Sequence, residues 1–104
     1  MINHIVLFKF KDDATEKQLE KIYRNLLGLK NKIYRIEDIS IGENTSPEKS
    51  KTHGYTHVLE VKFKDADCRD IYLWHPEHIW IVENDINPIK EDVEENVTVA
   101  DYEV

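Results

Sequence analysis

Pro76 divides the stretch Tyr72–Trp80, which would otherwise continue as one helix. The residue before a proline avoids the helical region of backbone space, whereas proline itself is favoured as the first residue of a helix. One helix is therefore predicted to end one or two residues before Pro76, and a second helix to begin there. The corner between them brings Tyr72 and His78 toward one point. A single helix would hold these two side chains on poorly matched faces.

The rest of the chain alternates between strand-like and helix-like patterns. Alternating apolar residues predict strands at residues 2–10, 35–42, 55–63 and 96–102. A capping box that begins at Thr15 starts the first helix, and Asp65 is predicted to cap the helix that ends near Pro76. The resulting order, β-α-β-β-α-α-β, is the split β-α-β pattern of a ferredoxin-like α+β fold, with one sheet and its helices on one face.

The first strand is apolar on both faces. Val6 and Phe8 lie on one face with Ile2, while Ile5 and Leu7 lie on the other. A strand of this kind is covered on both sides. A chain of 104 residues forms one domain, residues 1–104, whose own helices cover one face of the sheet. We expect a second copy of the protein to cover the other face, so the strand predicts a homodimer.

The charge balance and the single cysteine exclude several classes of protein. A net charge of −7 argues against nucleic acid or an anionic membrane as the main partner, because both attract a basic surface. No apolar run reaches the length of a membrane span, and the first residues show no signal-peptide pattern. Cys68 alone can form neither an internal disulfide nor a cysteine-based zinc site. The expected location is the cytoplasm.

Four polar side chains stand out against this apolar background. His4 and His57 each share a strand face with core residues, and Tyr72 and His78 flank the proline corner. Imidazole titrates near neutral pH and can act as acid or base, and a phenol can donate a hydrogen bond to a developing oxyanion. Two interpretations follow: proton-transfer chemistry on a carbonyl compound, or a polar cluster that lines a small binding cavity, which the residues alone favour.

A metal site is not expected. His75 and His78 are three residues apart across a proline, which is not a known metal-binding spacing. Glu77 between them is the only further ligand in that run. The prediction is therefore a protein without a bound metal or other cofactor.

Several segments together resemble the stress-responsive α/β-barrel (Dabb) family. They are residues 4–11, the string Gly54–His57, the run Tyr72-x-x-His75-Pro76-x-His78, and the closing Val99–Tyr102. The resemblance covers essentially the whole chain, and the His-Pro-x-His run is its most specific part. It implies a ferredoxin-like protomer that pairs through its sheet into a dimeric α/β barrel.

The resemblance also implies a site. One plant member of the family is a cyclase that closes a linear polyketide by an intramolecular aldol condensation. On this basis His78 matches a catalytic base, Tyr72 matches the phenol that orients and polarises the substrate, and His4 and His57 match pocket histidines. The other residues expected to line the cavity are His75, Tyr23, Leu26 and Trp80.

This sequence departs from the cyclase at two of those positions. Leu26 stands where the cyclase has a pocket tyrosine, and Trp80 stands where it has a glycine. With Trp74 also nearby, we expect a smaller or differently shaped cavity and a shorter substrate.

Three functional hypotheses remain open at this point. The leading one is a small cytoplasmic, homodimeric stress-response barrel protein that binds a small, partly apolar molecule between sheet and helices. The first alternative is an aldol-type cyclase, lyase or isomerase that uses His78 and Tyr72 without a redox cofactor. The second is a non-catalytic dimer in which the histidines are structural.

Overall fold

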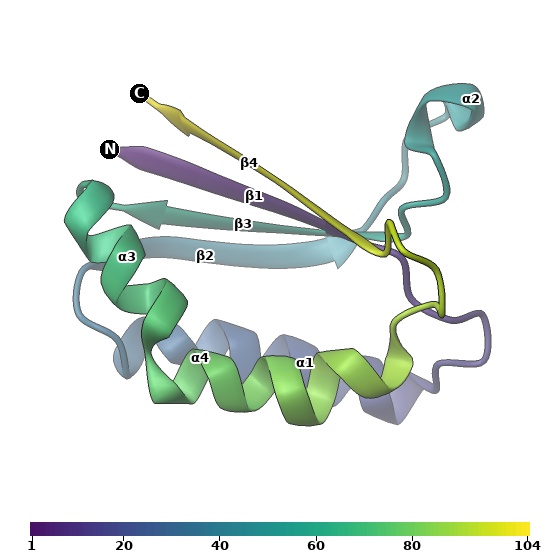
Figure 1. The fold of residues 1–104 in the computed structure, drawn as a ribbon, viewed down its shortest axis with the longest axis horizontal. Helices are drawn as coiled ribbons and strands as arrows, with labels where there is room; N and C mark the ends of the chain where they lie inside the picture. Colours follow the sequence, from purple (N-terminus) through teal and green to yellow (C-terminus); the bar gives the residue numbers. More distant parts are fainter.

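Four antiparallel strands form one sheet in the order β2-β3-β1-β4, and the helices lie on one side of it (Figure 1). The computed structural model describes residues 1–104. The elements are β1 (Ile2–Phe8), α1 (Glu16–Gly28), η1 (Leu29–Asn31), β2 (Ile36–Glu43), α2 (Lys49–Thr52), β3 (His57–Phe63), α3 (Ala66–Trp74), α4 (Pro76–Ile81), η2 (Val82–Ile86), η3 (Asn87–Ile89) and β4 (Val97–Glu103).

The predicted helix starts are confirmed. The amide of Gln18 donates to the Thr15 hydroxyl at 3.2 Å, and the Gln18 side chain accepts from the amide of Thr15 at 2.8 Å. These two bonds satisfy amides that the first turn of α1 leaves unpaired. Asp65 likewise accepts from the amide of Cys68 at 3.0 Å and starts α3.

The proline corner is also confirmed. His75 is extended, with φ −71° and ψ 134°, so α3 ends at Trp74 and α4 begins at Pro76. The side chain of His75 then caps α4, because its Nδ1 accepts from the amide of Glu77 at 3.1 Å. His75 is therefore the residue at which the chain turns from α3 into α4.

A π-helical segment, η2, continues α4 along the sheet. Its buried residue Asp85 accepts a hydrogen bond from Asn25 of α1 at 2.7 Å and lies 3.2 Å from the ammonium of Lys21. These contacts hold η2 against α1. They place Val82 and Ile86, which lie on one side of η2, toward the sheet.

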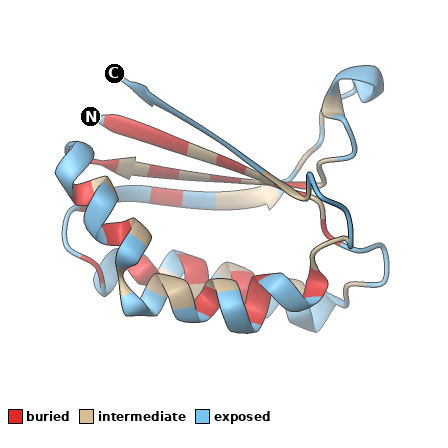
Figure 2. Ribbon diagram, viewed as in Figure 1, coloured by how far each residue is buried: buried red, intermediate tan, exposed pale blue.

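The core lies between the sheet and the helices. Figure 2 shows buried residues in the central strands and in the helices that lie against one face of the sheet. Phe63 and Val61 of β3 and Leu26 of α1 are almost completely buried there. Tyr72 of α3 is among them, which places a phenol in the centre of the apolar layer.

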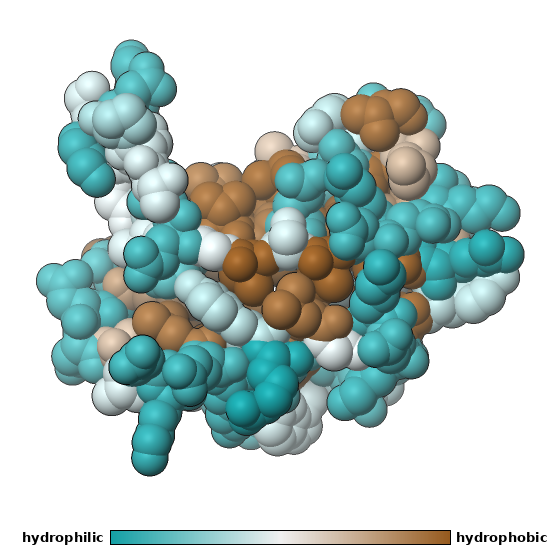
Figure 3. All heavy atoms as spheres, turned by 180° about the vertical axis from the view of Figure 1, so that it is seen from behind, coloured by the Kyte–Doolittle hydropathy of each residue, from teal (hydrophilic) through white to brown (hydrophobic).

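The other face of the sheet has no helix over it. Ile5 and Leu7 of β1 are only half-buried on that side, beside Val58 of β3 and the exposed Ala100 of β4. Figure 3 shows hydrophobic residues gathered in a hollow between two projections, the α2 segment and the end that carries both termini. As predicted, the first strand carries apolar residues on both of its faces. The chain's own helices cover only one of them.

None of the helices has the length and apolar character needed to cross a membrane.

Candidate functional site

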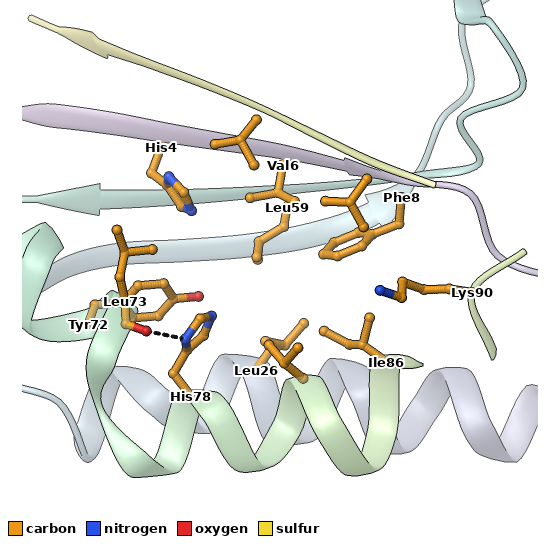
Figure 4. A pocket seen from close by; sticks show the side chains of 13 residues that line it. His4, Val6, Phe8, Leu26, Leu59, Tyr72, Leu73, His78, Ile86 and Lys90 are labelled. Atoms are coloured by element: carbon orange, nitrogen blue, oxygen red, sulfur yellow. Dashed lines mark hydrogen bonds between the residues drawn. The ribbon is translucent and has the colours of Figure 1, made fainter. Parts of the chain in front are cut away.

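A cavity of about 190 Å³ opens between the sheet and the α3–α4–η2 segment (Figure 4). Its walls are mostly apolar. His4, Tyr72 and His78 form a polar cluster at one end, and Lys90 lies at the other. The remaining lining residues are Val6, Phe8, Leu26, Leu59, Leu73, Val82, Ile86, Val97 and Val99.

Tyr72 comes from the last turns of α3 and is fully buried. Its ring packs against Phe63, with 5.0 Å between ring centroids, and against His78, with 4.3 Å. The hydroxyl oxygen has no hydrogen-bond partner within the protein. Burial raises the pKa of the phenol well above its ordinary value, so the hydroxyl stays protonated. The site therefore holds a buried donor with its hydrogen bond unused.

His78 comes from the first turn of α4, on the opposite side of the corner. Its Nδ1 lies 3.2 Å from the carbonyl oxygen of Leu73. A carbonyl oxygen can only accept, so Nδ1 carries the proton and donates it. In the neutral ring Nε2 is then a free acceptor. Burial lowers the pKa of His78, and the nearby His4 and His75 lower it further, against the hydrogen bond to Leu73. The ring is thus neutral and available as a base near neutral pH.

His4 is held by a charged partner from the neighbouring strand. Its Nδ1 lies 2.6 Å from Oδ1 of Asp101, whose Oδ2 accepts from Nη1 of Arg69 at 3.1 Å. The carboxylate fixes Nδ1 as the donor and leaves Nε2 on the cavity side. The centroids of the His4 and Tyr72 rings are 6.0 Å apart. Two oriented imidazoles therefore flank one phenol.

The prediction that His57 shares this cavity is not supported. His57 is buried, but its ring packs on Phe10 with 4.8 Å between centroids and on Tyr23 with 6.2 Å. It begins β3, whereas Phe63, which contacts Tyr72, ends it. Six residues of strand are roughly 20 Å long. Strand register correctly predicted the face on which His57 lies, but His57 is at the far end of β3 from Tyr72 and packs on Phe10 and Tyr23 instead of lining the cavity. Tyr23 does not line the cavity either.

The two tryptophans and His75 also lie outside the cavity. Trp80 is 51% exposed and Trp74 is 79% exposed, so neither fills the space beside His78. They lie on the outer side of the corner because α3 and α4 turn their buried residues, Tyr72 and Ile81, toward the sheet. His75 caps α4 instead. Of the additional cavity residues that we predicted, only Leu26 lines the cavity.

Sequence reasoning missed Asp101, Arg69 and Lys90. Asp101 could have been found from strand register, because β1 and β4 are antiparallel neighbours and Asp101 is directly opposite His4. No comparable signal marks Arg69, which reaches Asp101 from α3. Lys90 follows η3, where no periodic pattern predicts the direction of a side chain.

No group of three or more histidine, cysteine, aspartate or glutamate side chains in this structure is arranged to hold a metal ion.

Comparison with known proteins assigns the chain to a family. The profile of the stress responsive A/B barrel domain, Dabb, matches residues 2–104. Olivetolic acid cyclase from Cannabis sativa is 35% identical over 78 residues, which cover 75% of this chain and 76% of the cyclase. The protein At3g17210 from Arabidopsis thaliana has a similar structure, with a TM-score of 0.86 and 25% identity over 100% of this chain and 95% of that one.

A third similar structure is a dimeric protein of unknown function with a ferredoxin-like fold from Bacteroides fragilis. Its TM-score is 0.71 at 27% identity, covering 99% of this chain and 95% of that chain. The ferredoxin-like α+β fold predicted from the sequence is confirmed, and so is the predicted relationship: the chain belongs to the Dabb, or stress-responsive A/B barrel domain, family.

Proposed function

We propose that the cavity binds a small carbonyl compound and that His78 and Tyr72 catalyse proton transfer on it. One observation carries this proposal. The unpartnered hydroxyl of Tyr72 and the free Nε2 of His78 belong to rings 4.3 Å apart and border the same cavity. A buried hydroxyl without a partner is costly in a purely structural role, whereas a bound carbonyl oxygen would accept its hydrogen bond.

The chemistry follows from the two roles. Nε2 of His78 takes a proton from the carbon next to the carbonyl, and the oxygen of the resulting enolate accepts a hydrogen bond from the hydroxyl of Tyr72. In a substrate with a second carbonyl group, the enolate carbon then attacks that carbonyl carbon. The new alkoxide takes the proton back from His78. Run in reverse, these steps break a carbon–carbon bond, so the same groups serve an aldol-type cyclase or a lyase.

Similarity to olivetolic acid cyclase, a cyclase by name, supports this class of reaction. The dimensions of the cavity define the substrate further. At about 190 Å³ it is smaller than typical ligand pockets, which measure roughly 300–1,000 Å³. A substrate with a short chain fits it better than a long polyketide.

We also propose that two copies of the chain form a homodimer. The half-buried apolar residues on the uncovered face of β1 and β3 need a cover. Asn3, on the same face, is buried with its Oδ1 lacking a hydrogen-bond partner within the chain. A second sheet packed on this face would bury the apolar residues, and a protein of similar fold is itself described as dimeric.

Hydrogen–deuterium exchange at carbon tests the catalytic part. Small ketones and β-diketones are incubated with the protein in D₂O, and loss of the protons next to the carbonyl is followed by NMR. We expect exchange above the buffer rate, reduced about 10²- to 10⁴-fold by His78→Ala, which removes the base. Tyr72→Phe should slow exchange as well. His53→Asn, which changes an exposed histidine on the α2 side of the molecule, is the matched control.

Exchange at the wild-type rate in His78→Ala would refute the assignment of the base. Wild-type protein that accelerates exchange of none of these compounds would leave a binding protein without catalysis as the function of the cavity.

A further inference from the structure

Lys90 is the only lysine, arginine, aspartate or glutamate among the residues that line the cavity. Figure 4 shows its ammonium group directed into the cavity, at the end opposite Tyr72 and His78. Between the two ends the walls are hydrocarbon, and Phe8 and Ile86 are among the residues that form them. The cavity is therefore polar at both ends and apolar between them.

The backbone that carries Lys90 is held firmly. Residues 89–91 pair with residues 9–11 through two backbone hydrogen bonds of 2.8 Å, and the amide of Lys90 also donates to the carbonyl of Ile86 at 3.1 Å. The base of the side chain is thus fixed beside the end of β1. A fixed base keeps the side chain at this end of the cavity, with its ammonium directed inward.

The ammonium of Lys90 forms no ion pair within the chain. Acidic residues follow it directly, at Glu91 and Asp92, yet neither approaches within 4.0 Å of its Nζ. The other cation near the site, Arg69, is already engaged by Asp101. Lys90 is therefore the charge that remains available to an occupant of the cavity.

From this arrangement we infer that the ligand is an oxo acid: a carboxylate that pairs with Lys90, joined by a short aliphatic segment to the carbonyl that meets Tyr72 and His78. The carbonyl end of this assignment rests on the proposed function above. A single ammonium, without a second cation beside it, suits a carboxylate of one negative charge better than a phosphate of nearly two. The aliphatic segment lies along the hydrocarbon walls, where its burial adds affinity.

Matched acids and esters test the assignment. The probes are levulinate and its longer straight-chain methyl-keto homologues, each compared with its methyl ester, and the dissociation constants are measured by titration calorimetry. Wild-type protein should bind the acid of best-fitting length about 10- to 100-fold more tightly than its ester, the range for a hydrogen bond to a charged group. Lys90→Met keeps the aliphatic stem, so the ratio should fall to about one while the ester binds as before.

Lys51→Met removes one positive charge on α2, away from the cavity, and should leave the ratio unchanged. An acid preference that survives in Lys90→Met overturns the inference, as does wild-type protein that does not prefer the acid. This result is independent of the proton-transfer test. If Lys90→Met abolishes the preference but His78→Ala leaves proton exchange intact, the carboxylate contact stands and the catalytic proposal fails; the opposite pattern leaves catalysis without an oxo acid.

Discussion

The rings of Tyr72 and His78 lie 4.3 Å apart between centroids, although the two residues belong to different helices. Pro76 is the cause, because it ends one helix and begins the next at a corner. Each residue contributes what the other lacks. The hydroxyl of Tyr72 is a hydrogen-bond donor with no partner. Nε2 of His78 is a free acceptor, because Nδ1 of the same ring donates to the carbonyl of Leu73.

Replacing Tyr72 with phenylalanine should leave the protein as stable as before or more stable. The substitution removes a buried hydroxyl that has no hydrogen-bond partner, and it keeps the ring contacts with Phe63 and His78. We expect the free energy of unfolding in urea to stay level or to rise by about 1 kcal/mol.

The matched control for this prediction is Tyr102→Phe. The Tyr102 hydroxyl accepts a hydrogen bond from Asn3 at 2.8 Å, so its loss should cost roughly 0.5–1.5 kcal/mol. A Tyr72→Phe protein destabilised as much as this control would show that the hydroxyl of Tyr72 has a structural partner.

Stability should fall as the pH is lowered from about 7 toward 5. Burial lowers the pKa of both His57 and His78 in the folded protein. As the pH falls through the ordinary histidine pKa, the unfolded chain takes up protons that the folded chain does not, so protonation favours unfolding. The stability that the neutral rings provide is therefore complete above that pH and is lost below it.

The measurement is the free energy of unfolding against pH at one protein concentration, because a dimer depends on concentration. His57→Gln and His78→Gln should each flatten the curve between those pH values, whereas His53→Asn should not. If the curves of all three variants run parallel to that of the wild type, the buried histidines do not carry the effect.

Patterns that act along the chain were sufficient to predict most of the fold. The proline at position 76, the capping box at Thr15 and the alternation in β1 each depend on neighbours a few residues away, and all three appear in the structure. The convergence of Tyr72 and His78 follows from the same local rule. Strand β1 ends at Phe8 rather than Phe10, since only an isolated bridge to Lys90 continues it.

The parts of the site that escaped prediction depend on contacts between distant segments. Asp101 meets His4 across a strand pair whose residues are 97 apart in the chain. His57 lies on the expected face but at the end of β3 that is far from Tyr72 and His78, and periodicity cannot reveal that position. Large aromatic residues suggest burial, yet Trp74 and Trp80 are exposed. The helices α3 and α4 pack against the sheet through other faces, which carry Tyr72 and Ile81.

A charged residue introduced on the uncovered face of the sheet should prevent formation of the proposed dimer. Leu7 lies on that face near the end of β1, opposite Val58 on one neighbouring strand and Thr98 on the other. Leu7→Lys would bury a charge in the interface, which is costly without a partner. Light scattering at micromolar concentration should show a dimer for the wild type and a protomer of 12.3 kDa for the variant.

Leu27→Lys, on the exposed side of α1, makes the same chemical change on a surface that the dimer leaves free. It should stay dimeric. A wild-type protein that scatters as a protomer, or a Leu7→Lys variant that remains a dimer with its fold intact, would show that this face is not the interface.

Ligand binding in the cavity should change when Val82 is substituted but not when Trp80 is, although both residues belong to the α4–η2 segment. Val82 lines the cavity, so Val82→Phe should fill part of its 190 Å³ and weaken oxo acid binding severely. Trp80 is half exposed on the outer surface, where Lys21 lies 5.9 Å from the centre of its ring. Trp80→Ala should therefore change stability by about 1 kcal/mol or less and leave binding untouched. Calorimetric titration of both variants decides the matter: stronger or longer-chain binding in Trp80→Ala would mean that the tryptophan, and not the wall formed by η2, limits the length of the ligand.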